Sequence, residues 1–199
     1  MTSPAFFDQV PTITMQDPLS ALLGAATDGI IEYSYGDIVK LAGHSCPTVA
    51  GAYLMTRNAL KKLYGNAMPQ RGNIKVEFRD KAVDGVTGVI ANVVSFITGA
   101  TADTGFKGLA GKHDRRHLMF FDVPIAGEIR FQRLDTGESV TVAFHANVVP
   151  APATLMPALQ SILKGQADQK LHAAFAHDWQ DRVRQILEHA DHPELVTYA

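Results

Sequence analysis

Apolar and polar side chains alternate in three stretches of the chain, and this period of two predicts β-strands. One stretch covers residues 74–79. The other two cover residues 127–133 and 139–145 and flank the turn sequence Asp135-Thr136-Gly137-Glu138, so together they predict a β-hairpin. Residues 118–121 form an uninterrupted apolar run, which predicts a buried strand.

Helical spacing of apolar residues predicts two long helices. The first begins at Pro47, because proline suits the first helical position, and continues to about Tyr64, where Gly65 ends it. The second runs from about Ala167 to His189. Shorter helices are predicted over residues 19–26, 38–42 and 155–162.

Four stretches have patterns that are irregular or leave the structure open. Residues 1–18 contain three prolines, and we expect an irregular segment there. Residues 30–35 fit a strand or a loop, and residues 86–97, which are mostly small or β-branched, fit a helix or a buried strand. Residues 98–112 carry four glycines and few large apolar groups, which predicts a long exposed loop. Loops of this length within a compact domain are usually functional.

The composition is that of an ordinary globular protein, with 199 residues, 46% of them hydrophobic, and a formal net charge of −2. Because the chain is not strongly basic, we do not expect it to bind nucleic acid. No apolar run approaches the roughly 20 residues of a membrane-spanning helix, and the N-terminal sequence lacks the pattern of a signal peptide. These features predict a cytoplasmic protein without a membrane partner. The single cysteine excludes an intramolecular disulfide.

Candidate chemistry centres on the segment Gly43-His44-Ser45-Cys46-Pro47, which precedes the first long helix. Pro47 disfavours helical conformation at the residue before it, so Cys46 is the expected N-cap. In an extended segment, side chains two apart point the same way, so His44 and Cys46 would face one space and Ser45 another. The positive helix end favours the thiolate form of Cys46, a nucleophile and a metal ligand. A capping turn with a packed thiol is the alternative.

Histidines and basic residues near the glycine-rich loop supply further candidates. His113 and His117 are four apart and are the first additional metal ligands to consider, with a solvated basic edge as the alternative. Lys107 and Arg115 either hold an anionic substrate beside the loop or are surface charges. His145 is expected to be a satisfied histidine at a strand end rather than a ligand.

Three features resemble the FmdE family, which takes its name from a component of formylmethanofuran dehydrogenase. Residues 43–47 are similar to its Gly-His-x-Cys-Pro signature, residues 98–101 (Thr-Gly-Ala-Thr) are similar to its Thr-Gly-Cys-Thr segment, and the hairpin follows in the expected place. The chain departs from the family pattern where Val89 and Asn92 stand in place of Cys-x-x-Asp, and at Ala100. It also has no cysteine-rich C-terminal zinc finger, so it looks like a divergent member.

The resemblance implies an α+β fold, with a mixed or antiparallel sheet packed by helices. We expect an FmdE-like core over residues 1–150 and C-terminal helices over residues 151–199 that pack on the same core. The resemblance also implies that residues 89–97 are helical, that the protein is a homodimer, and that His44 and Cys46 line an active-site or metal-binding cleft.

Two hypotheses of function follow from these residues. The first is a cytoplasmic, metal-binding, FmdE-like protein of one-carbon or cofactor metabolism that acts on a small molecule at the His44 and Cys46 cleft. The second is a non-catalytic carrier or sensor in which the same pair holds a metal or haem. Covalent catalysis by the pair is a third choice. The expected ligands of zinc or another divalent transition metal are His44, Cys46, His113 and His117, and the expected cofactor-binding residues are Asn92, Thr98 and Lys107.

Overall fold

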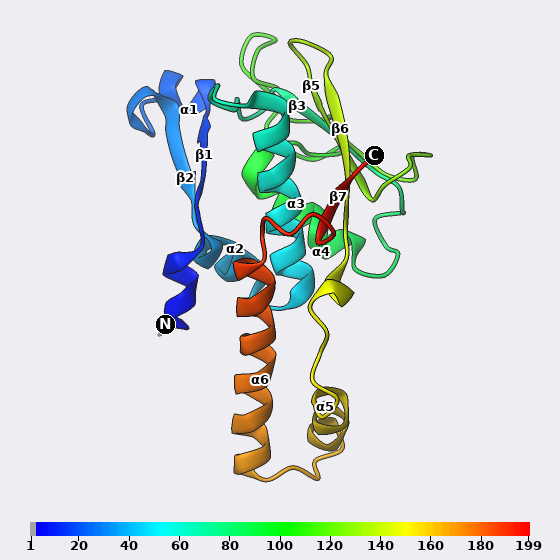
Figure 1. Cartoon of the computed structure of the whole chain (residues 1–199). Coiled ribbons are helices and arrows are strands. Elements are labelled where there is room, and N and C mark those ends of the chain that lie inside the picture. The colour runs from blue at the N-terminus through cyan, green and yellow to red at the C-terminus, as the bar shows by residue number, and fades with distance from the viewer. Residues whose placement is uncertain (1–2) are drawn as a thin grey trace.

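The computed structural model describes residues 3–199 and has an α+β fold, as expected (Figure 1). Within this range, five strands form one mixed sheet in the order β4-β3-β5-β6-β7, and two others form a separate antiparallel ribbon. The strands are β1 (Ile13–Gln16), β2 (Ile30–Tyr33), β3 (Ile74–Phe78), β4 (Met119–Phe120), β5 (Ile129–Arg133), β6 (Ser139–Phe144) and β7 (Val196–Tyr198). The α-helices are α1 (Pro18–Leu22), α2 (Tyr35–Ala42), α3 (Pro47–Tyr64), α4 (Thr87–Thr98), α5 (Leu155–Leu163) and α6 (Gln169–Glu188). Three short 3-10 helices are η1 (Ala5–Gln9), η2 (Thr27–Gly29) and η3 (Ala146–Val148).

Helix α3 is the centre of the core and contacts α2, α4, α6, β6 and β7. Its bounds confirm the prediction from Pro47 and Gly65, and 12 of its 18 residues are buried. Gly51 allows the helix to approach β6 closely, because a Cβ at this position would collide with the ring of Phe144. Figure 1 shows α3 between the sheet on one side and α6 and the N-terminal segments on the other.

The sheet confirms the predicted hairpin and shortens one predicted strand. Strands β5 and β6 pair antiparallel, and β3 pairs antiparallel with β5 and parallel with β4. The buried strand expected over residues 118–121 is only the two-residue β4. Its Phe120 is 40% exposed, because β4 is an edge strand that only β3 accompanies.

The N-terminal segment is more regular than its prolines predicted. Residues 1–2 lie outside the described residues, but η1 and β1 occupy much of the segment expected to be irregular. Strand β1 pairs antiparallel with β2, so residues 30–33, which fitted a strand or a loop, form a strand. The four residues of β1 do alternate between buried and half-buried, but so short a pattern between two prolines gives a weak signal. The helix predicted over residues 19–26 is the shorter α1.

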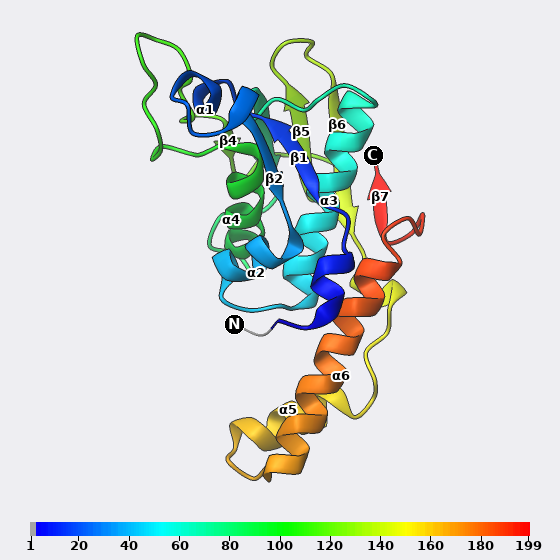
Figure 2. The ribbon, with the colours of Figure 1, turned by 90° about the vertical axis from the view of Figure 1, so that its left-hand side faces the viewer.

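Residues 86–97, which fitted a helix or a strand, form α4, and Gly99 ends it in a left-handed conformation. The loop predicted over residues 98–112 begins one residue later, after α4, and is longer than predicted, covering residues 99–118 with a short internal bridge between Leu109 and Lys112. We call residues 99–118 the glycine loop. In Figure 2 it protrudes on the side of the molecule that also carries α1, α2 and α4.

The C-terminal segment contains the two predicted helices and a strand that was not predicted. Val183, Ile186 and Leu187 bury the C-terminal part of α6 against the core. The remainder of α6 and α5 extend away from the sheet (Figures 1 and 2). Strand β7 then pairs with β6, so residues 151–199 complete the sheet as well as adding helices. Within residues 3–199, no helix combines the length and the hydropathy that crossing a membrane requires.

Candidate functional site

The segment before α3 has the alternation predicted for it. Ser45 is buried, with its hydroxyl 3.0 Å from that of Tyr35, whereas His44 is exposed and Cys46 is half-buried. Cys46 is the N-cap, because its Sγ accepts a hydrogen bond from the Val49 N–H at 3.4 Å. The predicted N-cap is therefore confirmed, and the shared orientation of His44 and Cys46 stays a prediction.

Helix α6 holds the same turn from the far end of the sequence. Trp179 Nε1 donates to the Ser45 carbonyl at 2.9 Å, and Gln180 Nε2 donates to the same oxygen at 3.2 Å. One carbonyl thus receives two side-chain donors from α6. These contacts join residues about 134 positions apart, and no local pattern in the sequence indicated them.

The four predicted metal ligands do not form one group. Residues 3–199 contain no cluster of three or more His, Cys, Asp or Glu side chains placed to hold a metal ion. His113 and His117 have φ values of 60° and 57°, so the segment is not helical and the spacing of four does not place them on a common helix face. His44 and Cys46 alone do not complete a tetrahedral zinc site, which needs at least three protein ligands.

A pocket of about 420 Å³ opens between α1, α2, α4 and the glycine loop. Among residues 3–199, two arginines, Arg71 and Arg115, are its only charged lining residues, and we call it the arginine pocket. In Figure 2, α1, α2 and α4 lie on the same side of the molecule. The lining residues are Leu19, Leu41, Arg71, Asn92, Ser95, Phe96, Gly99, Thr101, Phe106 and Arg115.

A single carboxylate, that of Asp17, connects the two arginines. It accepts a hydrogen bond from Arg115 Nη2 at 2.6 Å and one from Arg71 Nη1 at 3.0 Å. The same carboxylate caps α1 by accepting from the backbone N–H groups of Leu19 at 2.9 Å and Ser20 at 3.3 Å. Asp17 therefore positions three residues that line the pocket.

Arg115 is held in the pocket wall by its own backbone. The N–H and the hydroxyl of Thr101 both donate to the Arg115 carbonyl, at 2.9 and 2.7 Å, and the Arg115 N–H donates to the Phe106 carbonyl at 2.9 Å. Gly72 makes room for the guanidinium, because a Cβ there would overlap Arg115 Nη1. Three lining residues of the glycine loop are thus hydrogen-bonded to one another.

The electrostatics of this cluster keep its groups charged. Burial opposes ionisation of Asp17, but the hydrogen bond from Arg71 and the charge of Arg115 outweigh it and lower the pKa of that carboxyl. Burial lowers the pKa of Arg115, and Asp17 counteracts this. Arginine remains protonated in proteins, so two positive charges face one negative charge. The Nε atoms of Arg71 and Arg115 are buried and have no hydrogen-bond partner within the described residues.

The predicted ligand-binding residues divide between this pocket and other places. Asn92 and Arg115, which were predicted, line the arginine pocket together. Thr98 is fully buried, and its hydroxyl donates to the Val94 carbonyl at 2.7 Å within α4. This hydroxyl therefore bonds to the last turn of α4 and does not line the pocket. Lys107 is exposed on the glycine loop and is not among the lining residues. Asp17 and Arg71 were missed, since no motif surrounds them.

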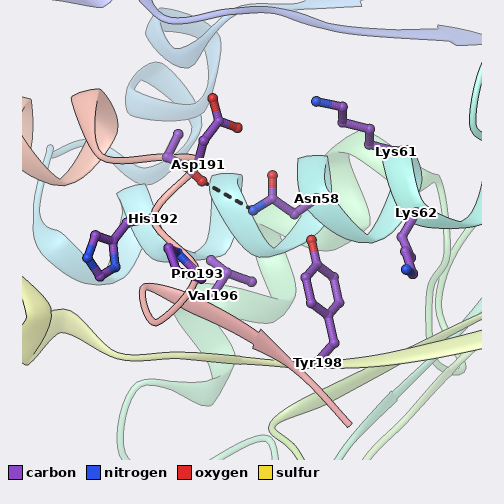
Figure 3. A pocket seen from close by; sticks show the side chains of 9 residues that line it. Asn58, Lys61, Lys62, Asp191, His192, Pro193, Val196 and Tyr198 are labelled. Carbon is purple, nitrogen blue, oxygen red and sulfur yellow. Dashed lines mark hydrogen bonds between the residues drawn. The ribbon is translucent and has the colours of Figure 1, made fainter.

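A second pocket, of about 320 Å³, lies between α3 and the C-terminal residues 190–198 (Figure 3). Its basic lining residues are Lys61, Lys62 and His192, beside the acidic Asp191, and Asn58 donates to the Ala190 carbonyl at 3.5 Å. All three basic residues are exposed, so water already solvates them. This pocket therefore lacks the buried charge that distinguishes the arginine pocket.

His145, predicted to be a satisfied histidine at a strand end, follows β6 directly. Its Nε2 lies 2.9 Å from the hydroxyl of Thr197 in β7. The imidazole therefore joins two neighbouring strands of the sheet, in agreement with the prediction.

Comparisons with known proteins do not test the resemblance to the FmdE family, which stays a prediction. No protein-family model matches the chain, and no curated protein matches it.

Proposed function

We propose that this protein binds a small anion in the arginine pocket. The observation that carries the proposal is the Asp17 carboxylate, which is shared by Arg71 and Arg115. Two guanidinium groups against one carboxylate leave one positive charge uncompensated at a pocket wall. Arg115 is only 5% exposed, so water does little to solvate its charge. A buried charge without full compensation is costly, and an anionic ligand would reduce that cost.

The pocket also has the construction of a binding site. Small-molecule sites combine apolar walls with a few placed polar groups, and their volumes are typically about 300–1,000 Å³. The arginine pocket has four large apolar side chains beside its two arginines, together with Asn92, Ser95 and Thr101. Guanidinium groups recognise carboxylate and phosphate through paired N–H donors.

Thermal melting in the presence of simple anions tests this proposal. The wild type is melted in acetate, sulfate or phosphate, and each melting temperature is compared with that in chloride at equal ionic strength. We expect at least one of the three anions to raise the melting temperature. The variant Arg71→Gln should lose this increase, because it removes the uncompensated charge. Arg57→Gln is the matched control, since Arg57 lines a different pocket on α3. Equal responses in both variants would overturn the proposal.

A second candidate function, FmdE-like metal binding at His44 and Cys46, is favoured by the orientation of one imidazole. His44 Nδ1 lies 2.9 Å from the Ala42 carbonyl, so it carries the proton and Nε2 offers its lone pair. Metal-binding histidines are commonly oriented by such a contact to a backbone carbonyl. Because two protein donors do not complete a zinc site, zinc or a similar ion needs further ligands from a bound molecule or a second copy of the chain. Haem iron, the alternative, needs only one or two axial ligands from the protein.

A further inference from the structure

We infer that the anion recognised by the arginine pocket is a monocarboxylate with an apolar body. This inference rests on the proposed function, and it adds the chemical class of the ligand. It depends on the charge of the pocket and on the distribution of apolar side chains around it.

The charge of the pocket matches one negative charge better than two. Arg71 and Arg115 are the only charged lining residues in the described part of the chain, and Asp17 neutralises one of them. A carboxylate would therefore bring the local formal charge to zero. A phosphate monoester carries about −1.5 to −2 at pH 7 and would leave excess negative charge beside the buried Asp17.

The apolar side chains are placed to accept the rest of such a ligand. Arg115 is 5% exposed, whereas Leu41 and Phe106 are 43% and 40% exposed. The charged group therefore lies deep and the exposed apolar groups lie towards the rim, where Leu19 and Phe96 add to the apolar lining. Large apolar side chains that remain exposed in a pocket gain stability when a ligand covers them. A ligand with a carboxylate at one end and a ring or short chain at the other satisfies both regions.

Helix α4 adds neutral polar groups between these regions. Asn92 and Ser95 present an amide and a hydroxyl to the pocket from one side of the helix. Asn92 is exposed, so a charge can be introduced there without disturbing the core. This residue therefore offers a test that leaves the buried arginines intact.

Isothermal titration calorimetry of the full chain with four probes tests the inference: benzoate, acetate, inorganic phosphate and benzyl alcohol. We expect benzoate to bind at least about tenfold more tightly than the other three, because only benzoate has both the charge and the apolar body. Asn92→Asp should weaken benzoate binding about tenfold, since it cancels the net charge of the pocket. Asn147→Asp is the matched control, because it adds the same charge at an exposed residue of η3. Phe106→Ser should weaken benzoate binding and leave acetate binding unchanged.

The outcomes separate the ligand class from the proposed function. Phosphate or acetate binding as tightly as benzoate would overturn the inference while supporting an anion site. Benzyl alcohol binding as tightly as benzoate would overturn both, because charge would then contribute nothing. Failure of all three anions to bind would overturn the proposed function itself. Equal effects of Asn92→Asp and Asn147→Asp on benzoate affinity would place its binding outside this pocket and overturn the inference.

Discussion

Replacement of Asp17 by asparagine tests the charge balance of the arginine pocket most directly. Asparagine has nearly the shape of aspartate and caps helices about as well, so the change removes a charge and keeps the cap of α1. Two guanidinium groups then surround a neutral amide, and one of them, Arg115, is only 5% exposed. Breaking a buried ion pair by removing one partner costs about 3–5 kcal/mol. We expect Asp17→Asn to lower the free energy of unfolding by about that amount.

Urea unfolding followed by the fluorescence of the single tryptophan, Trp179, measures this loss. In a domain of this size, about 1 kcal/mol corresponds to about 2–4 °C in melting temperature, so thermal melting should shift by about 6–20 °C. The pKa of Asp17 is lowered in the folded protein because its arginine partners outweigh its burial. Its contribution is therefore complete above the pKa of unfolded aspartate, about 3.9, and is lost as pH falls through the lower folded value.

The difference in stability between wild type and Asp17→Asn should accordingly be large at neutral pH and shrink in acid. Asp135→Asn is the matched control, because the exposed Asp135 pairs with Arg133 at the surface and its loss should shift the unfolding midpoint little. A loss in Asp17→Asn no greater than that in the control would refute the reasoning. A difference that stays constant through the acid range would refute it as well.

Three other substitutions test separate features of the structure. Gly72→Ala should lower the melting temperature, because the new Cβ overlaps Arg115 Nη1 and the φ of +82° is unfavourable for alanine. Trp179→Phe should lower the free energy of unfolding by about 1 kcal/mol, measured by circular dichroism in urea, because the indole N–H donates to the turn before α3. Elemental analysis of the purified wild type should find bound metal, and the variants Cys46→Ser and His44→Ala should each lose it. The circular dichroism spectra of both variants should match that of the wild type.

Each of these has an outcome that contradicts it. Gly137→Ala is the control for Gly72, because its φ of +77° is similar but its Cβ would meet no atom within 4 Å. Equal losses in the two glycine variants would show that Arg115 does not depend on the space at Gly72. An unfolding curve of Trp179→Phe that matches wild type would contradict a stabilising contact. Metal retained in both the Cys46 and the His44 variants would contradict the second candidate function.

The parts of the fold that were predicted correctly are those with long, locally encoded patterns. Helix α3 has a proline at its start, a glycine at its end and apolar spacing between them, and the β5–β6 hairpin has alternation on both sides of a turn. Strands β1 and β7 were missed because each has only three or four residues and depends on a partner strand. Short strands are specified by their neighbours more than by their own sequence.

The candidate site was only partly predictable for a related reason. Two predicted residues, Arg115 beside the glycine-rich segment and Asn92 within α4, line the arginine pocket. Asp17 and Arg71 lie in segments without a motif, and their role arises only where the folded chain brings them to Arg115. Cys46 was correctly predicted as the N-cap of α3, but the additional ligands that a metal would need were not found beside it among residues 3–199.

The hydrogen bonds that Asp17 accepts from Arg71 and Arg115 span 54 and 98 residues of the chain. Closing such long loops is slow compared with forming helices. A partly folded chain in which Asp17 and Arg115 are still apart therefore lacks a complete pocket. A ligand that recognises only the completed pocket adds to the stability of the native state in proportion to the logarithm of its concentration. If a ligand binds there as proposed, it would therefore increase the fraction of folded molecules and so protect the protein from degradation.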